Sequence, residues 1–218
     1  YEKKDDGMWI INYETAVLNT GYEDCDVTAE SNLLDKNGNI VASASGTGFV
    51  EKKDKAIIKY SAVVKNPLLW DCENPNLYTV KTVLKLNGEE IDENTTRIGF
   101  RTVEMSAEKG LLLNGKKTFI NGVCAHQDFG LTGLAVPDNI AKYKISLIKE
   151  MGANGYRTSH YQQTDAYMDA LDEMGFLVMD ETRWFESTTE SFKQIESLVK
   201  RDRNRPSVIM WSTSNEEP

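Results

Sequence analysis

The sequence places its only two histidines where parallel-sheet proteins carry out chemistry. His126 and His160 each follow a short segment that is predicted to form a strand, and Arg157 precedes the second histidine closely. The last predicted strand leads directly into Asn215 and Glu216. The carboxyl ends of parallel strands form the rim where α/β proteins bind ligands and catalyse reactions. Imidazole, guanidinium and carboxyl groups gathered there suit recognition of polyols and acid–base work.

Glycoside hydrolysis is a reaction that this set of groups fits. It requires two carboxyl groups across the scissile bond, about 5–5.5 Å apart in retaining enzymes, one to protonate the leaving oxygen and one to attack the anomeric carbon. Glu216, beside Asn215 at a predicted strand end, fits the acid/base role if burial or a neighbouring negative charge raises its pKa. Two further acids, Asp180 and Glu181, follow the third predicted strand and lie on the same rim.

The elements that must position these residues alternate between strand and helix. Apolar residues at helical spacing predict helices at residues 137–152, 164–175 and 188–202. Their inward faces are predicted to include Tyr143, Leu147, Met151 and Phe192. Short apolar stretches predict strands at 118–123, 153–157, 176–179 and 207–211. Such an order implies right-handed βαβ units and a parallel sheet, which is half of an eight-stranded barrel. A doubly wound sheet also fits, but no glycine-rich phosphate loop follows any strand.

The first hundred residues read as an all-β module. Runs rich in β-branched and aromatic residues occur at residues 9–17, 27–34, 56–64 and 77–86. Asn-Gly pairs within residues 36–39 and 86–89 favour tight hairpins. Five to seven such strands predict an immunoglobulin-like β-sandwich over residues 1–103, which leaves residues 104–218 for the N-terminal half of a (β/α)8 TIM barrel.

Composition excludes some partners. The 218-residue chain has a net charge of -9, and a nucleic-acid partner is not expected because phosphate binding needs a basic face. The longest apolar runs are far shorter than the roughly 20 residues needed to cross a membrane. Three cysteines lie far apart and are expected to be ordinary buried thiols. The chain starts at Tyr1 without an initiator methionine or signal sequence, so we expect a segment excised from a longer protein, whose compartment stays open.

Long motifs give the chain a family resemblance. "DRNRPSVIMWSTSNE" (202–216) resembles the acid/base signature of glycoside hydrolase family 2, which includes β-galactosidases, β-glucuronidases and β-mannosidases. "NGYRTSHY" (154–161) resembles the other signature of the family. "INGVCAHQDFG" (120–130) is similar to the first barrel strand and loop of β-galactosidase-like members. "NPLLWDCENPNLYTV" (66–80) resembles part of the immunoglobulin-like domain of the family, and "RIGFRTVE" (97–104) resembles the connection from that domain to the barrel.

This resemblance implies a role for each residue of the rim. Glu216 would be the general acid/base, and Asn215 would hydrogen-bond the sugar hydroxyl next to the anomeric carbon. His126 and His160 would line the sugar subsite, and Arg157 would steady the carboxylate of the nucleophile. Asp180 and Glu181 would either order the rim through salt bridges or contact sugar. No metal and no cofactor are expected.

The chain also departs from the family pattern. Gln162 stands where the family usually has proline. The N-terminal sugar-binding sandwich and the later barrel strands, one of which carries the nucleophilic glutamate, have no counterpart in the sequence. We therefore expect a fragment of a retaining exo-glycosidase of terminal β-D-galactosides that is inactive by itself. Its expected partners are a carbohydrate substrate, the remainder of the parent chain and, through the open half-barrel, a second copy.

Two other functions remain open at this point. One is a different activity in the same family, β-glucuronidase or β-mannosidase, because only the "AHQDFG" stretch favours a galactoside. The other is a non-catalytic sugar-binding scaffold, against which the intact pair of Asn215 and Glu216 weighs.

Overall fold

The computed structural model describes residues 1–4, 7–183 and 186–215, which form two compact units. The first unit consists of Tyr1–Leu68 and Leu77–Phe100. The second consists of Leu69–Asn76 and Arg101–Pro218, so it includes a short segment that lies in sequence between two strands of the first.

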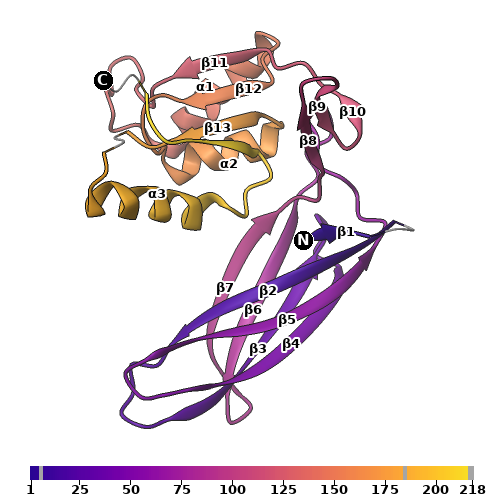
Figure 1. Ribbon diagram of the computed structural model, residues 1–218, viewed down its shortest axis with the longest axis vertical. Helices are drawn as coiled ribbons and strands as arrows, with labels where there is room; N and C mark the ends of the chain where they lie inside the picture. Colours follow the sequence, from indigo (N-terminus) through magenta and orange to yellow (C-terminus); the bar gives the residue numbers. More distant parts are fainter. Residues whose placement is uncertain (5–6, 184–185, 216–218) are drawn as a thin grey trace. The chain divides into compact units, whose positions relative to one another are not determined.

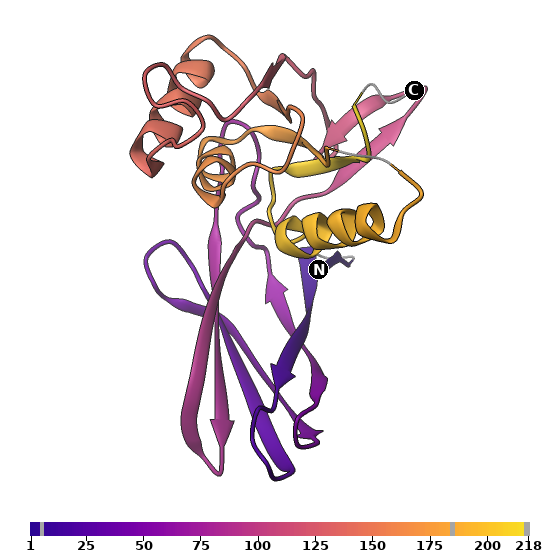
Figure 2. The same ribbon diagram turned by 90° about the vertical axis from the view of Figure 1, so that its left-hand side faces the viewer.

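The first unit is an antiparallel β-sandwich, as predicted. Its strands are β1 (Glu2–Lys3), β2 (Met8–Leu18), β3 (Cys25–Leu34), β4 (Ile40–Val50), β5 (Lys55–Lys65), β6 (Tyr78–Leu86) and β7 (Glu89–Ile98). One sheet has the order β1-β2-β5 and the other β4-β3-β6-β7, and the long strands are visible in Figures 1 and 2. The Asn-Gly pair between β6 and β7 forms the expected tight turn, with φ of 52° at Asn87 and 83° at Gly88.

Besides the two-residue β1, two strands of the sandwich were not marked by hydrophobic runs in the sequence. Strand β4 is rich in small residues, including Gly46 and Gly48, which bring it close to β5. Strand β7 is exposed over most of its length and is strongly polar. β4 forms because it pairs along its whole length with β3, and β7 because it pairs with β6. The residue pattern of a single segment does not reveal such pairing.

The core of the sandwich combines an aromatic cluster with a chain of hydroxyl groups. The rings of Tyr1, Trp9 and Phe100 lie within 5.3–5.6 Å of one another, centroid to centroid. Further along the sandwich, the Tyr60 hydroxyl lies 2.8 Å from Thr15 Oγ1 and 2.7 Å from Ser31 Oγ. The Ser31 hydroxyl in turn lies 2.7 Å from Thr82 Oγ1, so hydrogen bonds connect the two sheets.

The second unit opens with a hairpin sheet and continues as alternating strands and helices. The hairpin sheet contains β8 (Val103–Ser106), β9 (Gly110–Leu113) and β10 (Lys116–Lys117). There follow β11 (Gly122–Ala125), α1 (Asp138–Glu150), β12 (Gly155–Thr158), α2 (Asp165–Met174), β13 (Leu177–Glu181), α3 (Thr189–Asp202) and β14 (Val208–Ser212). The strands β11-β12-β13-β14 pair in sequence order and are all parallel, as predicted (Figure 1).

A core between this sheet and its helices holds α1 and α2 in place. It joins Ile145, Tyr167, Leu171, Tyr156 and Val178, all buried. The predicted inward faces were too wide, because Tyr143, Leu147, Met151 and Phe192 are 51%, 39%, 72% and 60% exposed. Neighbouring elements contact only a narrow stripe of each helix, and on α3 this stripe includes the polar residues Ser191 and Asp202.

An arginine just after α3 links that helix to α2. The Arg205 guanidinium lies 2.8 Å from Asp202 and 2.7 Å, 3.0 Å and 3.0 Å from Asp169, Asp172 and Asp165 of α2. The side chains of Asp172 and Asp202 are almost completely buried, and buried charges need a partner. Asp202 also pairs with Arg201, whereas the cation that pairs with Asp172 is Arg205.

The segment Leu69–Asn76 packs within the second unit. Trp70 is fully buried, and its indole N–H donates to the backbone oxygen of Asp172 at 2.9 Å. Its own backbone oxygen accepts from the Asn114 amide at 3.0 Å. Gly175, in the left-handed conformation, lies so close to the segment that a Cβ there would be 2.7 Å from the Cys72 oxygen. The segment Leu69–Asn76 is therefore tightly packed into the second unit.

The inner face of the parallel sheet is open and apolar. A cavity of about 270 Å³ there is lined mainly by residues such as Ile120, Leu177, Met179 and Ile209. Cys124 also lies on this face and is exposed, in contrast to the buried thiol expected from its type, while Cys25 and Cys72 are half-buried.

Among the described residues, no helix combines the length and hydrophobicity needed to cross a membrane.

Candidate active site

The carboxylate of Glu181 is the centre of the polar network at the carboxyl ends of the parallel strands. It is the last residue of β13 and is fully buried. One oxygen, Oε2, accepts from Arg157 Nε and Nη2 at 2.8 Å and 2.7 Å and from the Ser212 hydroxyl at 2.8 Å. The other oxygen, Oε1, lies 2.9 Å from His160 Nδ1. One buried anion thus connects the ends of β12, β13 and β14.

Arg157 extends this network to Asn215. Its Nη2 donates to Asn215 Oδ1 at 2.8 Å, and the hydrogen bond to Glu181 raises the pKa of Arg157 above its ordinary value. The side-chain oxygen of Asn215 is therefore occupied, which leaves the amide N–H groups of Asn215 to donate elsewhere. In the same way, a proton on His160 Nδ1 bonds to Glu181 and leaves Nε2 as an acceptor.

His126 lies beside the network, at the end of β11. Its ring stands edge-on to that of His160, with centroids 5.5 Å apart, and its Nδ1 is 3.4 Å from the Tyr161 hydroxyl. Lys144 of α1 donates to the backbone oxygens of His126 and Asp128 at 2.6 Å and 2.7 Å. This lysine holds the loop after β11 in place against the helix.

Asp180, next to Glu181 in sequence, belongs to a different environment. Its side chain points to the other face of the sheet, where Oδ1 accepts from the Thr158 hydroxyl at 3.1 Å. Burial and the neighbouring charge of Asp202 raise the pKa of Asp180 from 3.8 to about 7. The two adjacent acids therefore have different partners, because Glu181 lies on the inner face of the sheet and Asp180 on the opposite face, beneath α3.

The raised pKa of Asp180 predicts a pH-dependent stability. The folded protein keeps a proton there that the unfolded chain releases near its ordinary pKa of 3.8, so the stability that this group contributes is lost as pH rises from about 4 to about 7, by at most roughly 1.4 kcal/mol per pH unit. Asp180→Asn should flatten the dependence between about pH 4 and about pH 7 and stabilise the second unit at the upper end. Urea unfolding, followed by the helical circular dichroism signal, measures this. Parallel curves for both proteins would contradict it, and the exposed Asp138→Asn is the control.

The structure brings together most of the residues singled out in the sequence. Arg157, His160 and Asn215 meet around one carboxylate, and His126 packs against His160. Glu216, the predicted acid/base, lies outside the described residues. The roles of these residues in sugar binding and catalysis remain predictions.

Two residues of this constellation were missed in the sequence. Ser212 received no role in the sequence analysis, yet its hydroxyl donates to Glu181. Tyr161 adjoins the histidine that was identified, and its hydroxyl accepts from the Gln127 N–H at 3.3 Å. The available signals were the position of Ser212 directly after the predicted strand 207–211 and that of Tyr161 next to His160. In residues 1–4, 7–183 and 186–215, no group of three or more His, Cys, Asp or Glu side chains could hold a metal ion.

Comparison with known families identifies the class of protein. Residues 1–101 match the family described as "Glycosyl hydrolases family 2". Residues 103–192 and 185–218 match "Glycosyl hydrolases family 2, TIM barrel domain". The chain belongs to glycosyl hydrolases family 2, and its fold is the immunoglobulin-like sandwich of that family followed by the first half of the barrel.

Individual relatives carry two activities in their names. The chain is 37% identical over 226 residues to "Beta-galactosidase BoGH2A" of Bacteroides ovatus, a match that covers 97% of this chain and 26% of that protein. It is 30% identical over 217 residues to a "Beta-glucuronidase" of Bacteroides fragilis, covering 92% of this chain and 31% of that protein. The chain thus spans about a quarter to a third of the length of these relatives.

Solved structures give the same result. A glycosyl hydrolase family 2 member from Bacteroides cellulosilyticus is 35% identical with a TM-score of 0.90, covering 97% of this chain and 30% of that one. A β-glucuronidase from Bacteroides uniformis is 26% identical with a TM-score of 0.88, covering 97% of this chain and 26% of that one.

Proposed function

We propose that this chain is part of a retaining exo-glycosidase that hydrolyses terminal β-D-galactosides. The observation that carries the proposal is the network around Glu181, which fixes Arg157, His160 and Asn215 at the carboxyl ends of parallel strands. The similarity to β-galactosidases supports the choice of sugar. A β-glucuronidase activity is the second candidate, because relatives of that name match nearly as much of the chain.

In this mechanism the residues of the network act on different parts of the sugar. Asn215, whose oxygen is held by Arg157, donates its amide N–H to the hydroxyl next to the anomeric carbon, a bond that strengthens as charge develops there. His160, held by Glu181, accepts a hydroxyl proton through Nε2, and His126 lines the same subsite. Glu216 protonates the leaving oxygen and later deprotonates water.

The attacking carboxylate is proposed to lie in a part of the protein beyond these 218 residues. Glu181 is unsuited to attack because it is fully buried and both of its oxygens are bonded. Asp128 is exposed and pairs with Lys144 at 3.5 Å. We propose that the missing carboxylate contacts Arg157, that the remaining barrel strands cover the apolar inner face of the sheet, and that the 218-residue chain alone has no glycosidase activity and self-associates through this face.

The test is hydrolysis by the full-length protein of nitrophenyl β-D-galactoside, β-D-glucuronide and β-D-mannoside, with the anomer of the first product identified by NMR. We expect preference for the galactoside and a β-configured product. Glu216→Gln should lower kcat/KM about 10²-fold for an alkyl galactoside, which needs protonation, and much less for the nitrophenyl compound. Preference for the glucuronide would establish the second candidate. An inverted product, or equal losses on both leaving groups, would contradict the assigned chemistry.

A further inference from the structure

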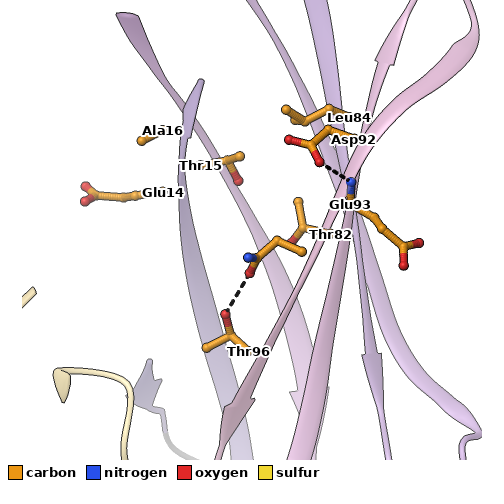
Figure 3. A pocket seen from close by; sticks show the side chains of 9 residues that line it. Glu14, Thr15, Ala16, Thr82, Leu84, Asp92, Glu93 and Thr96 are labelled. Carbon is orange, nitrogen blue, oxygen red and sulfur yellow. Dashed lines mark hydrogen bonds between the residues drawn. The ribbon is translucent and has the colours of Figure 1, made fainter. Parts of the chain in front are cut away.

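Lys144 of α1 is bound differently from the lysines that form ordinary ion pairs. Glu14, at the cavity of about 310 Å³ shown in Figure 3, pairs with Lys59 at 2.8 Å, and the side chain of this lysine is 69% exposed. Glu93 of the same cavity pairs with Lys81, also at 2.8 Å. The side chain of Lys144, in contrast, is 18% exposed, and its nearest partners are two backbone oxygens. An ammonium group bound in this way holds the backbone in place, which a surface ion pair between two side chains does not.

The loop that follows β11 carries His126. Residues 126–137 of this loop contain no helix and no strand, so side chains from other elements must fix its course. His126 is exposed, and its Nδ1 lies 3.4 Å from the Tyr161 hydroxyl, at the long end of the hydrogen-bond range. By contrast, His160 is held at 2.9 Å by the buried carboxylate of Glu181. The position of His126 therefore depends mainly on the position of its backbone.

Side chains from two helices bind three consecutive backbone oxygens of this loop. Lys144 Nζ donates to the oxygens of His126 and Asp128 at 2.6 Å and 2.7 Å. The Tyr167 hydroxyl of α2 donates to the Gln127 oxygen between them at 3.1 Å. The first and third oxygens thus point toward α1 and the second toward α2. This alternation fixes the backbone conformation directly after His126.

Both anchoring side chains belong to the packed part of the second unit. Tyr167 is 1% exposed, and Lys144 adjoins the fully buried Ile145 in α1. The Lys144 ammonium lies 5.9 Å from the centre of the Tyr167 ring, a distance at which a cation and an aromatic face attract each other. Burial raises the pKa of Tyr167, so its hydroxyl keeps the proton that it donates. The loop is therefore fastened to rigid elements.

The ammonium group of Lys144 directs all of its hydrogen-bonding capacity to the loop. An ammonium has three N–H groups. Two of them are taken by the backbone oxygens of His126 and Asp128, and the Asp128 carboxylate lies 3.5 Å from Nζ to accept the third. Lys144 can thus act on a bound sugar through the residues of the loop and not by direct contact.

We propose that Lys144, assisted by Tyr167, is a positioning residue that holds His126 in the sugar subsite. The inference rests on the proposed function, in which His126 lines that subsite. His126 contacts the sugar in the bound substrate as well as in the transition state, so a loosened loop weakens both complexes alike. Such a change raises KM and leaves kcat almost unaltered.

Kinetics and hydrogen–deuterium exchange of the full-length protein test the proposal, with the nitrophenyl glycoside that it hydrolyses best as substrate. Lys144→Met keeps the aliphatic stem and removes the N–H groups. If the loop then holds its present course about a tenth of the time, KM should rise about 10-fold while kcat changes less than about 2-fold. The amides of Gln127 and Phe129, both hydrogen-bonded within the site, should exchange about 10-fold faster.

Three further variants separate positioning from a general loss of structure. Lys144→Arg keeps the charge and has N–H groups for both oxygens, so it should restore most of the affinity. Tyr167→Phe keeps the buried ring and loses the bond to Gln127, and it should raise KM about 3-fold. Lys142→Met, on the same helix, removes an exposed pair with Glu173 and should leave KM and exchange unchanged.

Two results would overturn the proposal. Unchanged exchange of Gln127 and Phe129 in Lys144→Met would show that the loop keeps its course without the ammonium group. Faster exchange with an unchanged KM, or a loss confined to kcat, would show that the hold on His126 does not decide sugar binding. Failure of the proposed function is recognised separately, because the unaltered protein would then hydrolyse none of the glycosides. The sugar role of Lys144 would fall with it, whereas exchange would still report whether Lys144 holds the loop.

Discussion

Glu181→Gln is expected to lower kcat of the full-length enzyme about 10³-fold, with a much smaller change in KM. A glutamine amide offers N–H groups where Arg157, His160 and Ser212 all donate, so at least one of these groups must turn away or become an acceptor. A displacement of about 1 Å at a positioning residue can cost about 10²-fold in rate, and here several groups move together. The bond from Asn215 to the sugar strengthens in the transition state of the proposed mechanism, so the larger part of the loss should fall on kcat.

The same substitution should also reduce stability, and this must be separated from the effect on rate. Loss of a buried partner of Arg157 is expected to lower the free energy of unfolding by about 3 kcal/mol. Circular dichroism would show whether the variant is folded under assay conditions, and Ser212→Ala, which removes one donor and retains the anion, should lose less than about 10-fold in kcat. Glu150→Gln, at the exposed end of α1, is the matched control. A folded Glu181→Gln enzyme with unchanged kcat would refute the positioning role.

Arg205→Met is expected to lower the free energy of unfolding by about 3–5 kcal/mol. The substitution retains the length of the side chain, but it leaves Asp172 buried without its cation and removes one of the two arginines that pair with Asp202. Burial already raises the pKa of Asp172 above its ordinary value, and the Arg205 charge opposes that shift. Without it, the pKa of Asp172 should rise further, so the destabilisation should diminish as pH falls and the carboxyl becomes protonated.

Urea unfolding of Arg205→Met at several pH values would measure this effect. Arg203→Met is the matched control, since Arg203 is exposed two residues earlier, and it should change the free energy of unfolding by less than about 0.5 kcal/mol. Arg205→Lys should recover part of the loss, because an ammonium group keeps the charge but not the several directed bonds. Equal stability of the two methionine variants would show that the cluster contributes nothing.

Most helices and strands were predictable from local patterns, although the strand predicted at residues 118–123 is found at Gly122–Ala125 as β11. The helix between β11 and β12, for example, was bounded by Pro137 and Gly152, and the structure places α1 within those limits. The polar strand β7 and the small-residue strand β4 were not predictable in this way. Their existence depends on pairing with β6 and β3, which a single-segment pattern does not contain.

The site was predictable in its location more than in its organisation. Parallel strands bring their carboxyl ends to one edge, so His126, His160 and Asn215 could be assigned to one rim. The sequence could not distinguish Asp180 from Glu181, because the two-residue period sends adjacent strand residues to opposite faces and only the packed structure fixes which face is which. Glu181 proved to face the rim.

The segment Leu69–Asn76 has a consequence for modularity. The polypeptide passes between the two units three times, at residues 68–69, 76–77 and 100–101, so the sandwich is not a cassette with a single entry and a single exit. A recombinant sandwich ending near residue 100 would include Trp70 but not Asp172 or Asn114, with which Trp70 forms hydrogen bonds. The half-barrel expressed without residues 69–76 would lack the side chain that fills the space now occupied by the Trp70 indole. Exchange of whole domains during evolution is therefore restricted here, because any new barrel must bury the Trp70 indole and offer Trp70 the same hydrogen bonds.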